Sequence, residues 1–134
     1  MAIGLDTGFF IELLKDNVQA KEVWHKLIEG IEESALVSSL TLFELERLSL
    51  KGKLKKEAFD TLSEAIYGIC RIGWISDKES LSLAAKLSHG LGMPSVDALI
   101  LSYFVLGKAG EIYTTDSHFQ MYRKKGIRVI NLKE

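Results

Sequence analysis

Three acidic residues lie in stretches of the sequence that are otherwise largely apolar. Asp6 stands in IGLDTGFF, Glu44 in LTLFELERL and Asp97 in SVDALIL. Asp97 is the only ionised residue of the segment 96–106, and apolar residues follow it three, four and seven positions later. A carboxylate on such a face is normally paired, protonated or bound to a metal ion, because burying it alone is costly. These acids are therefore candidates for a functional site.

A fourth acid, Asp116, follows the apolar stretch IYTT. If the four carboxylates converged they would repel, since two of them about 4 Å apart cost on the order of 4 kcal/mol at an effective dielectric near 20. Protons or cations must then neutralise the cluster. Hard oxygen donors suit Mg²⁺ or Mn²⁺, which activate water and stabilise charge on a phosphoryl group. Convergence would thus predict the chemistry of a nuclease or a phosphatase.

The segments that must position these acids alternate between short strands and helices. Apolar periodicity predicts strands at 2–6, 34–39, 111–116 and 127–132, with 70–76 either a strand or a connector. It predicts helices at 7–14, 18–31, 41–52, 55–70, 77–92, 95–106 and 117–126, with Ser95 as a candidate cap after Pro94. This alternation predicts an α/β fold, a three-layer α/β/α sandwich around a central, mostly parallel sheet. Strand ends and the helix starts that follow them share one edge of such a sheet, where ligands bind.

A purely structural explanation of each acid stays open. Acids are favoured at helix starts by the helix dipole, and Asp97 needs no other reason to be there. Asp6 and Asp116 have the positions of N-caps. Thr41 and Glu44 have the spacing of a capping box in the segment TLFE. A set of caps without function would account for each acid taken alone.

Composition places the chain in an ordinary class. Its 134 residues predict one domain over 1–134, with 47% apolar and 26% charged residues. One cysteine, Cys70, excludes an intrachain disulfide and favours a reducing cytoplasm. The sequence shows neither a leader peptide nor an apolar run of the roughly 18 residues that span a bilayer, so we expect a cytoplasmic protein without membrane contact.

The charge pattern bears on nucleic-acid binding. The formal net charge of −1 gives no long-range attraction for nucleic acid, so binding would need local basic patches. Arg47 and Lys51 form one candidate patch, and Arg123 and Lys124 form another. Such runs are also typical of solvated helix ends.

Four segments together carry a resemblance to a known family. IGLDTGFFIELL, VSSLTLFELERL, MPSVDALILSYFVLG and IYTTDSHF occur in this order at ordinary spacing. As a set the sequence resembles the PIN-domain family, and within it the VapC-like toxins of toxin–antitoxin pairs. The resemblance implies a Mg²⁺- or Mn²⁺-dependent endoribonuclease, commonly a homodimer, often restrained by a small antitoxin protein.

The resemblance also assigns roles to residues. It implies that Asp6, Asp97 and Asp116 hold the metal ion and that Glu44 completes the cluster and orients or deprotonates the attacking water. Thr7 and Thr115 match polar positions that orient ligands or water. Many relatives have a further acid two residues after the last one, and His118 stands there instead. His118 is then a metal ligand, a hydrogen-bond donor to phosphate, or an exposed residue without a role.

Two other functions compete with this hypothesis. One is a non-catalytic PIN-like module that binds RNA or a protein partner. The other is a phosphotransfer domain with acids at strand ends, which Gly8 opposes because it stands where a phosphatase of that type has its second acid.

The aromatic residues of the N-terminal half give a further expectation. Core positions are expected for most of the set Phe9, Phe10, Trp24 and Phe43. Because Phe9 and Phe10 are adjacent on a short helix, one of them is expected at an interface.

Overall fold

Five parallel strands form the centre of the molecule. The computed structural model describes residues 2–31, 34–124 and 126–133. The strands are β1 (Ala2–Leu5), β2 (Ser34–Ser38), β3 (Arg71–Gly73), β4 (Ala109–Thr114) and β5 (Arg128–Asn131). They lie in the order β3-β2-β1-β4-β5, and every neighbouring pair is parallel. The undecided segment at 70–76 is thus an edge strand, β3.

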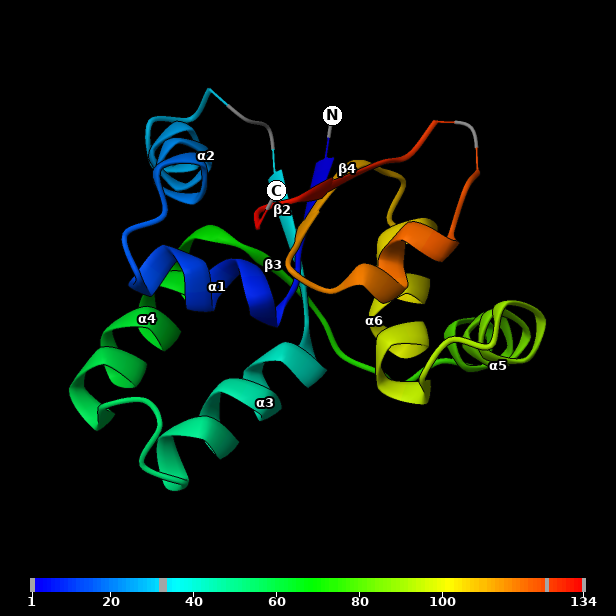
Figure 1. Cartoon of the computed structure of the whole chain (residues 1–134), viewed down its shortest axis with the longest axis horizontal. Helices are drawn as coiled ribbons and strands as arrows, with labels where there is room; N and C mark the ends of the chain where they lie inside the picture. The colour runs from blue at the N-terminus through cyan, green and yellow to red at the C-terminus, as the bar shows by residue number, and fades with distance from the viewer. Residues whose placement is uncertain (1, 32–33, 125, 134) are drawn as a thin grey trace.

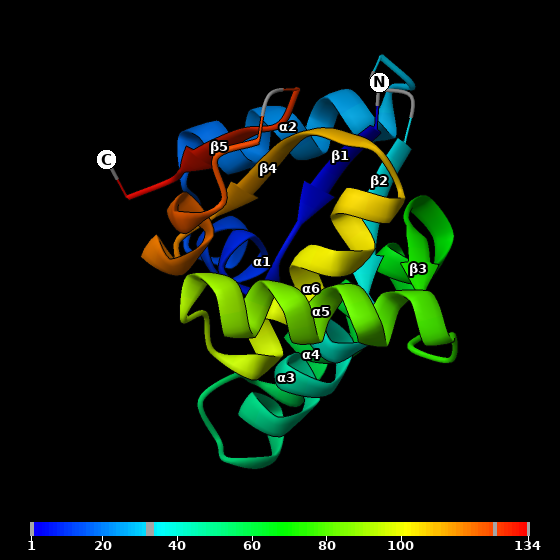
Figure 2. The same ribbon diagram turned by 90° about the vertical axis from the view of Figure 1, so that its right-hand side faces the viewer.

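Helices cover both faces of this sheet. The helices α1 (Thr7–Leu14), α2 (Val18–Ile28), α3 (Ser39–Leu50) and α4 (Lys56–Ile69) lie on one side of the strands in Figure 1. On the other side are α6 (Ser95–Leu106) and, outside it, α5 (Lys78–Leu91), as the turned view in Figure 2 shows. The three-layer α/β/α fold predicted from the sequence is confirmed.

The strands contribute side chains to two separate hydrophobic cores, because successive side chains point to opposite faces of the sheet. In β2, Ala35 and Val37 join the core beneath α1–α4, whereas Leu36 joins the core beneath α5 and α6. In β1, Gly4 faces α6, where an added Cβ would lie 2.7 Å from the ring of Phe104. A side chain at this position would push the helix off the sheet, so the absent Cβ lets α6 approach closely.

The helix α1 is buried on two sides, which corrects the expectation for its phenylalanines. Phe9 lies 6.3 Å from the ring of Tyr113 on the sheet, and Phe10 lies 5.8 Å from Trp24 on α2. Both phenylalanines are fully buried, because α2 covers the side of α1 that the sheet leaves open. The expected interface phenylalanine is therefore wrong, and Phe43, which is 63% exposed, is the one outside the core.

Several helix boundaries differ from those expected. The helix expected at 18–31 ends at Ile28, and Ile31 is exposed. Ser95 does not cap α6: it is the first helical residue, and no side chain caps that helix. The helix expected at 117–126 is a single 3₁₀ segment, η1 (Ser117–Met121), after which Tyr122 turns to an extended conformation. Runs of 3₁₀ helix are short because their hydrogen bonds are poorly aligned.

The strand order reverses between β1 and β4. The chain moves from β1 outward through β2 to β3, and then crosses to the other side of β1 to form β4 and β5. In open α/β sheets such a reversal leaves a crevice at the carboxyl ends of the two strands, where ligands bind. Asp6 follows β1 and Asp116 closely follows β4, so both acids stand at this crevice. Within the described part of the chain, no helix is long and apolar enough to cross a membrane.

Candidate metal centre at the carboxyl edge of the sheet

The structure brings the four acids to one small pocket. They come from the start of α1, the second turn of α3, the first turn of α6 and the segment after β4. The pocket has a volume of about 190 Å³, and its lining residues are Asp6, Thr7, Gly8, Ile11, Glu44, Asp97, Ile100, Thr115, Asp116 and Phe119. Since one water occupies about 30 Å³ of liquid, the space suits an ion with a few waters or a phosphate group, but not a large cofactor.

Asp6 is held rigidly by two donors. Its Oδ1 accepts a hydrogen bond of 3.0 Å from the backbone N–H of Phe9, so Asp6 is the N-cap of α1 as one structural explanation required. Its Oδ2 accepts a hydrogen bond from the hydroxyl of Thr114. The hydroxyl oxygen of Thr114 in turn accepts a hydrogen bond of 2.8 Å from the N–H of Asp116. The bond between Thr114 and Asp6 links the end of β4 to the end of β1.

Capping does not make Asp6 an ordinary surface acid. The residue is only 4% exposed, and burial is the main reason that its pKa rises to about 7. The hydrogen bonds from Thr114 and Phe9 oppose this shift, while the nearby carboxylates of Asp116 and Glu44 add to it. A carboxyl group that resists ionisation at neutral pH marks a place where a cation would be favourable.

Asp97 projects from the first turn of α6 into the same pocket. The apolar residues Ile100, Leu101 and Phe104 of this helix are buried in the core, so they anchor the helix. Burial and the adjacent carboxylate of Asp116 raise the pKa of Asp97 to about 6, although His118 opposes the shift. The apolar face thus fixes the helix while its first turn carries one carboxylate to the cluster.

His118 lies against two of the acids rather than free on the surface. Its Nδ1 is 3.0 Å from Oδ2 of Asp97 and 2.8 Å from Oδ1 of Asp116. Its backbone N–H also donates to Oδ1 of Asp116 at 2.8 Å, which makes Asp116 the N-cap of η1. His118 thus has two partners within the acidic cluster, and its role remains a prediction.

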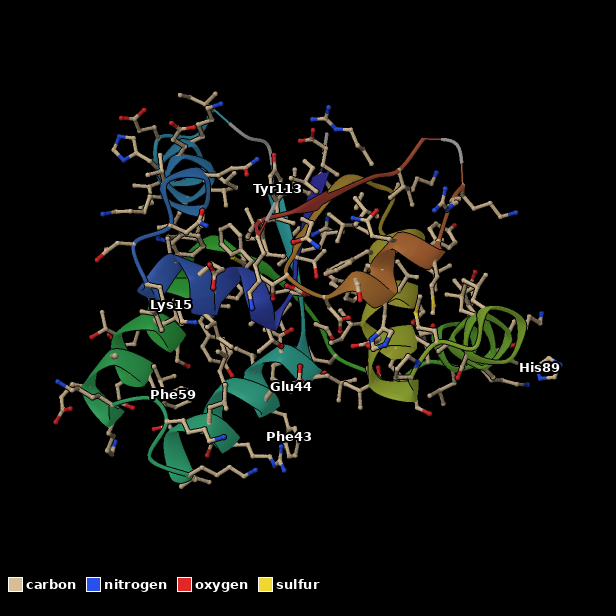
Figure 3. All side chains as sticks on the ribbon, viewed as in Figure 1. Lys15, Phe43, Glu44, Phe59, His89 and Tyr113 are labelled. Carbon is tan, nitrogen blue, oxygen red and sulfur yellow. The ribbon has the colours of Figure 1, made fainter. Side chains whose placement is uncertain are left out.

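Glu44 occupies the second turn of α3 and is no capping residue. The N-cap of this helix is Ser38, whose hydroxyl accepts from the N–H of Leu40 at 3.2 Å, so the capping box suggested by Thr41 and Glu44 does not form. Thr7 donates a hydrogen bond of 2.5 Å to Oε1 of Glu44. Figure 3 shows Glu44 on α3, and the neighbouring Phe43 is turned outward to solvent.

Two threonines of the site were not found from the sequence. Thr114 binds Asp6 directly, and the hydroxyl of Thr41 lies 3.2 Å from that of Thr7. Of the two threonines in the segment TTD, the sequence analysis assigned a role to Thr115. Thr115 does line the pocket, where it packs against Gly8. The alternation of side chains along the strand could have indicated Thr114. It is the last residue of β4 and is fully buried, so its hydroxyl needs a hydrogen-bond partner inside the molecule.

The donors present fit a divalent cation. One atom each from Asp97, Asp116 and His118 lie within 4.8 Å of one another. Two carboxylate oxygens and one imidazole nitrogen are a ligand set that divalent ions of the first transition row accept. Glu44 also lines the pocket.

The basic residues expected to bind RNA are exposed and lie in two places. Arg47 and Lys51 are at the C-terminal end of α3, which runs away from the sheet in Figure 1. Arg123 and Lys124 follow η1 and line a separate hollow of about 370 Å³ beside α5. The structure brings neither pair into the acidic pocket.

The comparisons with known proteins decide the family. A model of the PIN domain matches residues 3–125 of the sequence. The chain belongs to the PIN domain family. This membership confirms the resemblance seen in the sequence and replaces the phosphotransfer alternative. None of the curated proteins matches the sequence at a significant level.

Solved structures of similar fold agree with this assignment. The PIN-domain chain is 20% identical to a chain of the VapBC2 complex of Rickettsia felis bound to promoter DNA, with a TM-score of 0.76 and 98% of each chain covered. It is 15% identical to a chain of VapBC-1 from nontypeable Haemophilus influenzae, with a TM-score of 0.72 and full coverage of both. It is also 20% identical to a chain of a toxin–antitoxin complex from Klebsiella pneumoniae, with a TM-score of 0.71 and 98% of each chain covered. At these identities the similarity shows the fold.

Proposed function

We propose that this PIN-domain protein is an endoribonuclease that hydrolyses RNA phosphodiester bonds with a bound divalent ion, as the toxin of a toxin–antitoxin pair. The observation that carries the proposal is the convergence of four acids, from four separate segments, on one pocket at the switch point of the sheet. Helix caps after parallel strands share this edge of the sheet, but capping gives no reason for four carboxylates to line one small pocket. Their mutual repulsion has to be compensated by positive charge.

Asp6, Asp97 and Asp116 would hold Mg²⁺ or Mn²⁺, directly or through waters. The fit rests on oxygen donors within one small pocket and on the raised pKa values of Asp6 and Asp97. Burial, with repulsion from neighbouring carboxylates as a smaller cause, raises both pKa values, and a cation in the pocket would oppose both causes. When bound, such an ion polarises a phosphodiester and acidifies a coordinated water.

The other side chains of the pocket orient the attacking water and accept its proton. Glu44 is the candidate general base for the attacking water, since its carboxylate lines the pocket and a hydrogen bond from Thr7 fixes one oxygen. The second oxygen of Glu44 is then the one that accepts the proton. Thr115 stands at the pocket wall, where its hydroxyl can bind water or phosphate oxygen.

RNA is the proposed substrate, and its chain has to lie mostly outside the pocket. A volume of about 190 Å³ takes a phosphate group, so flanking nucleotides must contact the surface. Arg47 and Lys51 on one side, and Arg123 and Lys124 on another, are exposed cations that could pair with phosphates there.

An antitoxin protein is the proposed partner. An apolar hollow of about 690 Å³ runs along α2, and Val18, Ile28 and Ile31 at its rim are 73%, 58% and 65% exposed. Exposed apolar groups of this kind are typical of protein contact surfaces. The homodimer, the single domain over 1–134 and the cytoplasmic location remain proposals of the same kind, and light scattering of the purified protein measures the first of them.

The test is RNA cleavage by the purified protein with Mn²⁺ or Mg²⁺ and with EDTA. We expect cleavage that needs the ion and is lost in Asp97→Asn, which keeps the shape of the side chain but removes its charge. Glu79→Gln is the matched control, since Glu79 lies in the first turn of α5 and is exposed. Cleavage by Asp97→Asn at the wild-type rate would refute the proposal.

A second candidate function follows from His118. An imidazole within 3.0 Å of two carboxylates can neutralise part of the cluster without a metal ion. A folded protein that binds RNA or a protein partner, but neither binds divalent ions nor cleaves RNA, would identify a non-catalytic PIN-like module.

A further inference from the structure

The imidazole of His118 lies against the carboxylates of Asp97 and Asp116. The side chain of Asp97 is 18% exposed and that of Asp116 is 33% exposed, and Nδ1 of His118 is within 3.0 Å of both. The imidazole itself is 42% exposed. The ring is therefore positioned by the protein and still reachable from solvent, as a metal ligand must be.

Asp6 differs from these three groups. Both of its oxygens accept hydrogen bonds from protein donors, and the residue is 4% exposed. Each oxygen keeps a further lone pair that could face an ion, but this carboxylate is the least exposed of the three aspartates of the site. The two aspartates that are more accessible from solvent, Asp97 and Asp116, are the ones that His118 contacts.

The distances between these three groups suit a common ligand sphere. Ligands about 2.1 Å from an octahedral ion lie about 3 Å from their neighbours in that sphere. The separations of Nδ1 from the two carboxylate oxygens are 2.8 and 3.0 Å. These are separations at which the three atoms could face one ion with little movement of the side chains.

We propose that His118 is a direct ligand of the divalent ion and that it makes this site prefer Mn²⁺ and other transition-metal ions over Mg²⁺. The inference rests on the proposed function, which requires a bound divalent ion. It adds that His118 is the ligand that determines which ion is preferred. Mg²⁺ takes oxygen ligands, whereas an imidazole nitrogen favours ions of the first transition row. An acid at position 118 would instead favour Mg²⁺ by adding charge and a hard oxygen.

The other two histidines provide internal controls. His25 pairs with Glu29 on α2 at 2.9 Å, and both side chains are at least half exposed. His89 lies on α5, and Figure 3 shows it at the outer end of the molecule, away from α3 and the strand ends. Among the described residues, the cluster of potential metal ligands contains His118 and neither of these two histidines.

The test measures binding and ligation apart from activity. The full chain is freed of metal with EDTA, and titration calorimetry then measures the affinities for Mn²⁺ and Mg²⁺. Pulsed electron paramagnetic resonance of the Mn²⁺-loaded protein detects the ¹⁴N coupling of a coordinated imidazole. We expect this coupling in the wild type, and a Mn²⁺ affinity at least about tenfold above that for Mg²⁺.

Two substitutions separate ligation from hydrogen bonding. His118→Asn keeps an amide group near the place of Nδ1, so it preserves a hydrogen-bond donor while removing the imidazole. His118→Asp supplies a carboxylate. Both should lose the ¹⁴N coupling, and His118→Asp should reduce the ratio of Mn²⁺ to Mg²⁺ affinity by on the order of tenfold. The double variant His25→Asn/His89→Asn should keep both the coupling and the ratio.

The outcomes distinguish this inference from the proposed function. Mn²⁺ binding and RNA cleavage without ¹⁴N coupling, with an unchanged affinity ratio in His118→Asp, would overturn the role of His118 and leave the nuclease proposal standing. Failure of the folded wild type to bind either ion would overturn both. Coupling that persists in His118→Asn would also reject the inference, because another nitrogen would then be the ligand.

Discussion

The burial of Asp6 predicts an unusual dependence of stability on pH. The residue is 4% exposed, and its pKa rises from 3.8 to about 7, chiefly through burial. Substituting Asn for Asp6 keeps the shape of the side chain and removes its ionisation. We therefore expect Asp6→Asn to stabilise the metal-free protein at alkaline pH, although it removes a residue of the proposed site.

The sign follows from the protons bound in each state. Between pH 4 and 7 the unfolded chain has released the proton of Asp6 and the folded protein retains it, so the free energy of unfolding falls as pH rises. Above pH 7 the loss is complete. The shift from 3.8 to about 7 is about three units, and each unit is worth 1.36 kcal/mol, which gives a loss of about 4 kcal/mol.

The substitution has a cost that offsets part of this gain. The amide oxygen of Asn can still accept from the N–H of Phe9, and the amide nitrogen would donate to the hydroxyl oxygen of Thr114. The hydroxyl proton of Thr114 then loses its acceptor, and losing one hydrogen bond of this kind costs about 1 kcal/mol. The net stabilisation at pH 8 is then roughly 2–3 kcal/mol, or a rise in Tm of on the order of 10 °C for a chain of this size.

Thermal unfolding in EDTA at pH 5, 6, 7 and 8 measures the effect. The Tm of the wild type should fall over this range more steeply than that of Asp6→Asn, and added Mn²⁺ at pH 8 should stabilise the wild type more. Asp77→Asn is the control, because Asp77 is an exposed N-cap whose pKa is lowered from 3.8 by its hydrogen bonds to Ser80. The stabilisation from its charge is lost only as the pH falls below about 4, so Asp77→Asn should lower Tm by the same amount at every pH from 5 to 8. A variant Asp6→Asn that is less stable than the wild type at pH 8 would refute the reasoning.

Three further substitutions test the packing and the chemistry of the site. Glu44→Gln should reduce RNA cleavage by on the order of 10²–10⁴, as expected for a general base, whereas Glu46→Gln on the exposed side of the same helix should leave the rate unchanged. Gly8→Ala would place a Cβ 2.1 Å from the hydroxyl of Thr115; it should lower Tm, and adding Thr115→Ala should restore much of the loss. Gly4→Ala would place a Cβ 2.7 Å from an aromatic ring of α6, so a urea titration should show a loss of about 1–3 kcal/mol, with metal binding retained.

The general fold and the meeting of the acids could be predicted because they depend on patterns of many residues. Alternating strands and helices imply a parallel sheet, and residues after parallel strands necessarily share an edge. Asp6 and Asp116 could be placed at that edge from the order of segments alone. The roles of the four acids remain predictions, since they need an ion or a substrate to be tested.

The features that escaped prediction depend on contacts between distant segments. Phe9 and Phe10 are both buried because α2 packs over α1, which no periodicity within a short helix can indicate. A capping box with Glu44 requires α3 to begin just after Thr41. The helix begins at Ser39 with Ser38 as its N-cap, so Glu44 lies too far into the helix to take part in capping. Thr114 acts through a carboxylate 108 positions away in the chain. Local propensity carries no information on such pairs.

The central claim is that the four acids form a divalent-ion site, and a crystal structure of the protein soaked in Mn²⁺ tests it most directly. An anomalous difference map should show a peak in the pocket between Asp97 and Asp116, within bonding distance of an oxygen of each. The same crystals grown from Asp97→Asn should lack the peak. A map without a peak in this pocket, from crystals of a protein that cleaves RNA in Mn²⁺, would contradict the account.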